Sequence, residues 1–165
     1  MTHPAYTPAH YLTNGYAAKR AIMRAIAARA AQPGNPLSDV QVLYKLRTSV
    51  MEKVCIYGGG FIFEQASGDG EDDLVDGPAR LPFERLIVAV HIRMVVSPPD
   101  LDMEATDIAV ELMGDEIAAM VARDPHLAGG KSSAYFVGGE GDYTPDDASD
   151  IVTLSTRIAV DSYVI

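Results

Sequence analysis

Glu-Arg-Leu-Ile-Val-Ala-Val-His-Ile-Arg-Met-Val-Val, residues 84–96, is the clearest strand pattern in this chain. Apolar side chains occupy every second position, so they share one face of a strand: Leu86, Val88, Val90, Ile92, Met94 and Val96. Arg85, His91 and Arg93 fall on the other face. This alternation predicts a sheet that is buried on one side only.

A helix is predicted directly after this strand. Ser97-Pro98-Pro99 ends the strand because proline has no N–H for the ladder, and Asp100 or Asp102 can cap a helix that runs to about Arg123. Apolar residues at three- and four-residue spacing define the face expected to pack: Ala105, Ala109, Leu112, Met113, Ile117 and Met120. Acidic residues form a separate stripe that is expected to be solvated: Glu104, Asp107, Glu111 and Asp115.

The flanking sequence predicts a second helix and four more strands. Tyr16–Ala31 is alanine-rich and basic, and Pro33-Gly34-Asn35-Pro36 ends this helix. Two polar, acidic segments, Ala66–Leu81 and Gly138–Asp150, are expected to be long loops. Runs rich in β-formers predict the strands: Val40–Leu46, Lys53–Glu64 with an interruption at Gly58–Gly60, Ser133–Val137 and Ile151–Val164.

The chain length of 165 residues suits one domain. Met1–Leu12 contains Pro4 and Pro8 and is expected to be an extended N-terminal arm. Residues 13–165 are expected to form a single α+β domain. In that domain a mostly antiparallel sheet has two helices packed on one face and long acidic hairpin loops.

Composition excludes several classes of function. The formal charge of −10 opposes binding to a polyanion, and no basic stripe interleaved with aromatic residues offsets it. No apolar run is long enough to span a bilayer, so no membrane association is expected. The basic first helix and the acidic second helix are interpreted as two solvated faces, with pairing across a subunit contact as the alternative.

No catalytic, cofactor or metal site is expected. Cys55 and His91 are the only internal pair that could form a thiol–imidazole dyad, and no third orienting group is evident. The single cysteine is expected to be a buried, inert thiol. Gly58–Gly60 lacks the Lys-Ser/Thr and the following helix that a phosphate-binding loop needs, so a bulge or a close backbone approach is the preferred interpretation.

A calcium site is the sharper interpretation of the acidic loop that contains Asp69, Glu71 and Asp73. Counting from Asp69, an EF-hand needs glycine at the sixth position and glutamate at the twelfth. This chain has Leu74 and Arg80 there. A solvated acidic loop is therefore the prediction.

The order of elements resembles the tail terminator proteins of long-tailed bacteriophages and the related tail-completion proteins of the neck. The shared features are an amphipathic N-terminal helix, a strand pair with a long loop, a long arginine-bearing strand and a second helix. Asp124-Pro125-His126-Leu127-Ala128-Gly129-Gly130 is similar to the Asp-Pro-x-Leu-x-Gly turn that often follows that helix in the family, and the last strand carries Arg157.

The resemblance implies a viral structural protein of the virion neck, assembled in the host cytoplasm and without enzymatic activity. It implies a ring, typically a homohexamer, that caps the tail tube, ends its polymerisation and provides the docking surface for the head-completion protein. DNA would pass through the lumen without specific binding, because carboxylates repel phosphates. The candidate partner or lumen contacts are Glu71, Asp72, Asp73, Asp76, Glu104, Asp107, Glu111 and Asp115. The alternatives are another neck component, such as a head–tail stopper or a minor tail protein, and a small ligand-binding domain or enzyme.

Overall fold

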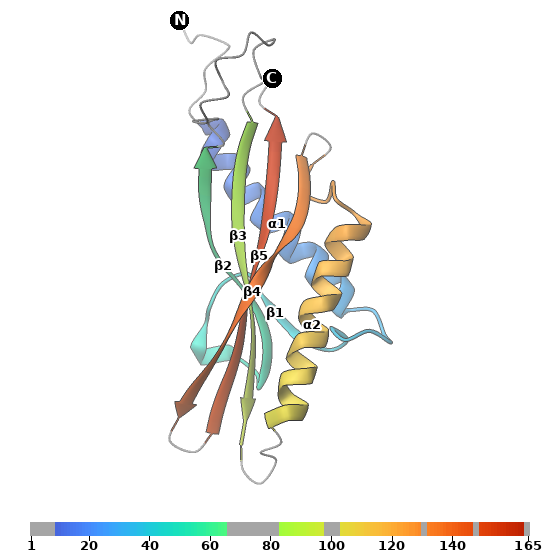
Figure 1. Cartoon of the computed structure of the whole chain (residues 1–165), viewed down its shortest axis with the longest axis vertical. Helices are drawn as coiled ribbons and strands as arrows, with labels where there is room; N and C mark the ends of the chain where they lie inside the picture. The colour runs from blue at the N-terminus through green and yellow to red at the C-terminus, as the bar shows by residue number, and fades with distance from the viewer. Residues whose placement is uncertain (1–8, 66–82, 98–102, 130–131, 147–148, 164–165) are drawn as a thin grey trace, which may run out of the picture.

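The computed structural model describes residues 9–65, 83–97, 103–129, 132–146 and 149–163. These residues form an α+β fold with two helices and one five-stranded sheet (Figure 1). The elements follow the chain in the order α1 (Ala9–Ala30), β1 (Gln41–Leu43), a 3-10 turn (Thr48–Val50), β2 (Val54–Gln65), β3 (Phe83–Val96), α2 (Met103–Arg123), β4 (Ser132–Asp146) and β5 (Ser149–Tyr163). Neither of these helices is long and apolar enough to cross a membrane.

The sheet has the strand order β1-β2-β3-β5-β4. β1 is parallel to β2, and the other neighbours are antiparallel. β3 is central and pairs along most of its length with both β2 and β5. The four long strands twist strongly about one another (Figure 1), as strands of L-residues do. The predicted fold class, a mostly antiparallel sheet with two helices, is confirmed.

The hydrophobic core lies on the face of β3 that the alternation predicts. The side chains of Leu86, Val88, Val90, Ile92 and Val96 are buried, and Met94 is partly buried. The matching face of β5 adds Val152, Thr156, Ile158 and Val160. Thr156 is the polar member of this group, and its hydroxyl donates a hydrogen bond to the carbonyl of Val90 (2.8 Å). This part of the core is therefore apolar, and the hydroxyl of Thr156 within it is satisfied.

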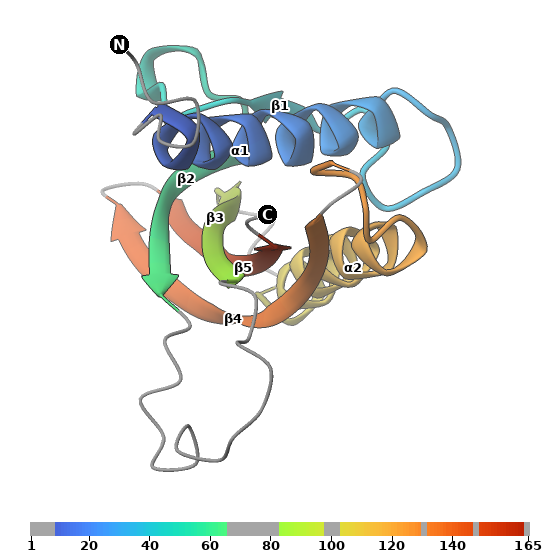
Figure 2. The ribbon, with the colours of Figure 1, turned by 90° about the horizontal axis from the view of Figure 1, so that it is seen from above.

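Both helices cover this same face. Ile22 and Ile26 of α1 and Ile117 and Val121 of α2 belong to one cluster of buried residues with the β3 side chains. α1 packs over β1, β2 and β3, whereas α2 packs over β3, β5 and β4. Viewed along the strands, the two helices lie on different sides of the molecule (Figure 2). Each helix thus has an inner face in the core and an outer face.

The buried face of α2 differs from the predicted one. Ala105 and Leu112 were expected to pack, but both are exposed. The buried residues are Thr106, Val110, Met113, Gly114, Ile117, Met120 and Val121. The helix is therefore turned about its axis relative to the prediction. Gly114 faces the sheet, and a Cβ there would lie 2.9 Å from Cδ2 of Leu154 on β5. The helix approaches the sheet most closely where it has no side chain.

Three other predictions about elements need correction. α1 begins at Ala9, so residues 9–12, expected in an extended arm, are helical; residues 1–8 lie outside the described part of the chain. β1 has only 3 residues, shorter than the predicted strand Val40–Leu46.

The expected loop Gly138–Asp150 is wrong, because residues 138–146 continue β4 and residues 149–150 begin β5. A register shift between Phe136 and Gly138, whose φ is 143°, lets β4 continue along β5. The expected loop Ala66–Leu81 lies outside the described residues.

The substitution Val90→Asp should lower the free energy of unfolding by about 3 kcal/mol or more, because it places an unpaired carboxylate in the core. Val90 has no exposed surface, whereas Val137 on β4 is 52 % exposed. Val137→Asp is therefore the matched control and should cost less than about 1 kcal/mol. Urea denaturation followed by circular dichroism measures both values, and equal midpoints for the two variants would contradict the assigned core.

Candidate functional site

The predicted acidic contacts divide into two groups. Glu71, Asp72, Asp73 and Asp76 lie outside the described residues, as does Asp69 of the calcium hypothesis. Glu104, Asp107, Glu111 and Asp115 lie on α2, and all except Asp107 are exposed. The structure therefore brings three of the eight predicted residues together on one outward-facing surface.

Asp107 is turned toward the sheet instead. Its carboxylate accepts a hydrogen bond from the hydroxyl of Tyr143 on β4 (2.6 Å). This hydrogen bond, together with partial burial, raises the pKa of Tyr143. Tyr143 was missed in the sequence because its segment was assigned to a loop. Asp107 thus ties α2 to β4 and is less available to a partner than its acidic neighbours.

The acidic surface of α2 borders exposed apolar side chains. Ile108 is 50 % exposed and Leu112 is 51 % exposed. Leu112 was expected in the core, and Ile108 was not assigned a role. The sequence did contain a sign of this exposure, because α2 has more apolar residues than one helix face can bury. The glycine within the helix indicates which face is buried.

A cleft of about 950 Å³ lies next to these side chains, between α2, residues 36–40 and the start of β2. Its lining is mostly apolar and includes Met51, Met94, Leu112 and Met113, and it also contains the charged residues Asp39, Glu52 and Lys53. Methionine side chains are flexible and polarisable, so such a surface adapts to different apolar groups. The cleft can therefore accept an apolar or aromatic side chain.

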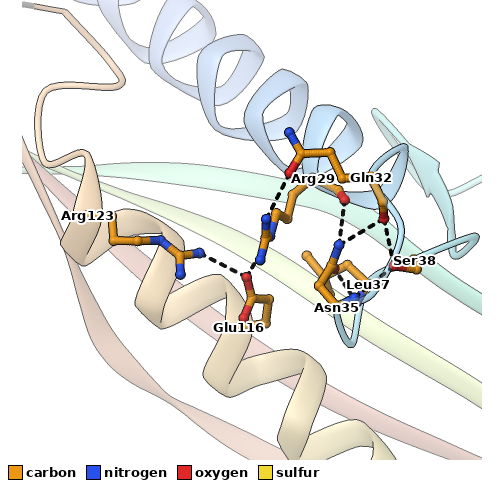
Figure 3. A network of polar contacts seen from close by, with 7 residues as sticks. All are labelled: Arg29, Gln32, Asn35, Leu37, Ser38, Glu116 and Arg123. Atoms are coloured by element: carbon orange, nitrogen blue, oxygen red, sulfur yellow. Dashed lines mark hydrogen bonds and ion pairs between the residues drawn. The ribbon is translucent and has the colours of Figure 1, made fainter.

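The connection between α1 and β1, which forms one wall of the cleft, is held by hydrogen bonds (Figure 3). The amide of Asn35 donates to the carbonyls of Arg29 and Gln32 (3.0 and 2.9 Å), and its Oδ1 accepts from the N–H of Leu37 (2.8 Å). The hydroxyl of Ser38 donates to the carbonyl of Gln32 (2.6 Å). These hydrogen bonds satisfy carbonyls at and just after the end of α1, and they fix the conformation of this wall of the cleft.

One carboxylate links the two helices across this region (Figure 3). Glu116 of α2 accepts hydrogen bonds from Arg29 of α1 (2.7 Å) and from Arg123 of its own helix (2.9 Å). Burial opposes ionisation of Glu116, but the hydrogen bonds and charges of the two arginines outweigh it and lower its pKa. The basic and acidic helices are thus paired at one point within the chain.

Cys55 and His91, the pair considered for a thiol–imidazole dyad, make separate contacts. Cys55 is buried, burial raises the pKa of its thiol, and its Sγ contacts its own strand at the carbonyl of Ile56. His91 instead shares a hydrogen bond with Ser155 (2.8 Å) and stacks on Tyr57. Burial lowers the pKa of His91, which keeps the imidazole neutral at pH 7. This group has the contacts of a structural histidine.

Packing accounts for two glycines of the Gly58–Gly60 triplet. A Cβ at Gly58 would lie 2.4 Å from the carbonyl oxygen of Tyr44 and 2.8 Å from Cε of Lys19, and one at Gly59 would lie 2.6 Å from Nε2 of His91. A Cβ at Gly60 would meet nothing within 4 Å. The strand continues through the triplet with a register shift, which confirms the predicted bulge. Close approach of α1 on one face and His91 on the other explains these glycines without a ligand.

Comparison with known proteins identifies no family. No protein-family model matches this chain, and a search of curated proteins finds no match. In the part of the chain that the structure describes, no group of three or more His, Cys, Asp or Glu side chains is suited to hold a metal ion. The function must therefore be argued from the surfaces described above.

Gly58→Ala should lower the free energy of unfolding by about 1–3 kcal/mol, because the new methyl group meets backbone that must shift. Gly60→Ala is the matched control, since the space beside it is open and its φ is not positive, and it should change stability by less than about 0.5 kcal/mol. Thermal denaturation of both variants tests this. Equal destabilisation by the two substitutions would show that packing does not explain the triplet.

Stability should depend on Glu116 in a way that varies with pH. The pKa of Glu116 in the folded chain lies below its value in the unfolded chain, ~4.3. Its ion pairs therefore stabilise fully above that value, and the contribution is lost as pH falls through the folded-state pKa. Glu116→Gln should cost about 1 kcal/mol at pH 7 and much less at about pH 3.

Glu140→Gln is the control for this experiment, because Glu140 is exposed and has no ion pair among the described residues. Urea denaturation at both pH values gives the free energies. A Glu116→Gln cost that is the same at both pH values would argue against the ion pairs.

Proposed function

We propose that this chain is a structural protein of the tail terminator type, which forms a ring on the finished tail tube, ends tube polymerisation and presents a surface to the head-completion protein. It acts through geometry and complementary surfaces rather than through catalysis. Its place is the neck of the virion, after assembly in the host cytoplasm.

The observation that carries this proposal is the outer edge of β4. Among the described residues this 15-residue strand pairs only with β5, so its other edge has backbone groups without strand partners. Only its start is covered, where the N–H of Ala134 donates to the carbonyl of Pro125 and His126 contacts the carbonyl of Ser132. Tyr135 and Val137 are exposed beyond that point. A long open edge favours pairing with another chain.

The order of the elements also supports the proposal. A helix, a strand pair, a long arginine-bearing central strand and a second helix occur in the order that the resemblance led us to expect. Arg85 of the central strand is paired with Asp161 through two hydrogen bonds (2.9 and 3.2 Å). The turn after α2 is present from Asp124 to Gly129, with N–H groups of Leu127 and Gly129 bonded back to the turn. In this proposal the Arg85–Asp161 pair and the turn after α2 have structural roles that hold the subunit together.

The charge of the chain fits passage of DNA. A formal charge of −10 and exposed carboxylates on α2 repel phosphates, so a ring of such subunits would let DNA slide without adhering. The α2 acids are candidates either for this wall or for a partner contact. Other neck components would share this charge but would not bind tube subunits.

A ligand-binding or enzymatic role has less support from the geometry. The apolar cleft lies on the helix-covered side of the sheet, next to Met94. His91 and Ser155 lie on the opposite side of the same strands, because residues 91 and 94 differ by an odd number of positions. The polar pair and the cleft therefore do not combine into one site.

The proposal is tested by adding the purified protein to the polymerising tail-tube protein of the same virus. Tube growth should stop, and negative-stain images should show an annulus at tube ends. The Val90→Asp variant, whose core is disrupted, is the control and should leave growth unchanged. Tubes that grow to the same length with and without the folded protein would overturn the proposal.

A further inference from the structure

An apolar strip on the outer face of α2 has no cover within the described fold. At about 100° per residue, Ile108 lies at the centre of this outward face and Leu112 lies toward the cleft. Glu104, Glu111 and Asp115 line the other side of the face and are all exposed. An exposed apolar helix face that adjoins an apolar cleft and is bordered by charge is typical of a surface that docks a protein helix.

The outer face of α1 has the complementary character. α1 contains no acidic residue. Arg20 and Arg24 are exposed one turn apart, and within the described residues neither has an ion-pair partner. Ala27 and Tyr16 lie beside them at helical spacing; Tyr16 packs edge-on against Phe61 of β2 (4.9 Å between ring centroids) and is still 53 % exposed. Thus a basic band adjoins a weakly apolar band on α1, as an acidic band adjoins an apolar band on α2.

We propose that the outer face of α1 in one copy of this chain docks on the outer face of α2 and the adjoining cleft in the next copy. Arg20 and Arg24 are four residues apart, as are Glu111 and Asp115, so two ion pairs can form at matching helical spacing. Tyr16 and Ala27 then face Ile108, Leu112 and the cleft. This inference rests on the proposed ring and specifies its subunit contact.

The charges favour a second copy as the occupant. α1 and α2 run in different directions over the shared core (Figure 2), and the exposed face of each points away from that core, so these two faces do not meet within one chain. Among the residues that the structure describes, the ion pair between the two helices uses other side chains, Arg29 and Glu116. A contact between two different faces is heterologous, and repetition of it closes into a ring when the rotation permits. The α2 acids are then part of the subunit contact rather than of the lumen wall.

Charge reversal on one side of this contact tests the inference. Sedimentation velocity at about 0.1 M salt, where screening is incomplete, measures the assembly. The variant Arg20→Glu/Arg24→Glu should weaken subunit association by about a hundredfold or more, because like charges then face each other. Glu111→Lys/Asp115→Lys should do the same. All four residues are exposed, so both variants should keep the circular dichroism spectrum and melting temperature of the parent.

Mixing the two variants in equal amounts should restore rings. In an alternating ring of even number, every contact then joins a reversed α1 with a reversed α2, or an unchanged α1 with an unchanged α2. The control is Arg47→Glu/Arg157→Glu, which changes the net charge as much as Arg20→Glu/Arg24→Glu does but at exposed positions outside both helices, and it should assemble like the parent.

The outcomes separate the inference from the proposed function. Rings that persist in either reversed variant, or reversed variants that fail to reassemble when mixed, would overturn the α1–α2 contact while leaving the ring role in place. A parent protein that stays monomeric at all concentrations and does not affect tube growth would overturn the ring role itself.

Discussion

The structure depends on covering the apolar face of β3. Val88, Val90 and Ile92 have no exposed surface, and two helices provide the cover among the described residues. α1 covers the β1 side and α2 covers the β4 side, so the inner face of each helix is used for the core. The outer faces remain exposed and carry opposite charges. Among the described residues, those charges are paired between the helices at Arg29 and Glu116.

The other face of the sheet needs no helix because its side chains satisfy one another. Arg85 and Asp161 are directly opposite on β3 and β5 and form a two-pronged ion pair. His91 is hydrogen-bonded to Ser155, its direct cross-strand neighbour. Polar pairs of this kind tolerate water. Ile62 on β2, directly opposite Ile87, is nevertheless 67 % exposed on this face. Assembly surfaces are therefore expected first on the helices and on the β4 edge, where exposed apolar side chains lie beside charged residues or unpaired backbone.

Alternation and helical spacing were enough to predict the elements that bury one face. The strand at residues 84–96, its inward side chains and both helices follow from periodicity, and the sheet class follows from one-sided burial. Periodicity could not predict the rotation of α2, because a glycine, Gly114, decides it through a close contact with Leu154 on a distant strand. It also missed residues 138–146, more than half of β4, because Gly138, Gly139 and Gly141 do not have the composition of a strand, and the ladder there is supplied by β5.

For the candidate site, sequence identified the acids of α2 but not their neighbours. Charge is readable residue by residue, whereas exposure of Ile108 and Leu112 depends on how the helix is turned. The cleft combines residues from α2, the α1–β1 connection and the start of β2, which lie far apart in the chain. No local pattern could bring them together.

β1 is attached to the sheet by a short parallel ladder, so the N-terminal part of the fold has fewer backbone hydrogen bonds to the sheet than the long strands have to one another. Strands β2 to β5 are joined by long antiparallel ladders, and α2 packs on three of them. The N-terminal third is attached through the inner side of α1 and a ladder of three residue pairs. We therefore expect α1 and β1 to open as one unit more readily than the long ladders separate. Such an opening would uncover part of the core in a free protomer, and any neighbour that grips α1 would suppress it.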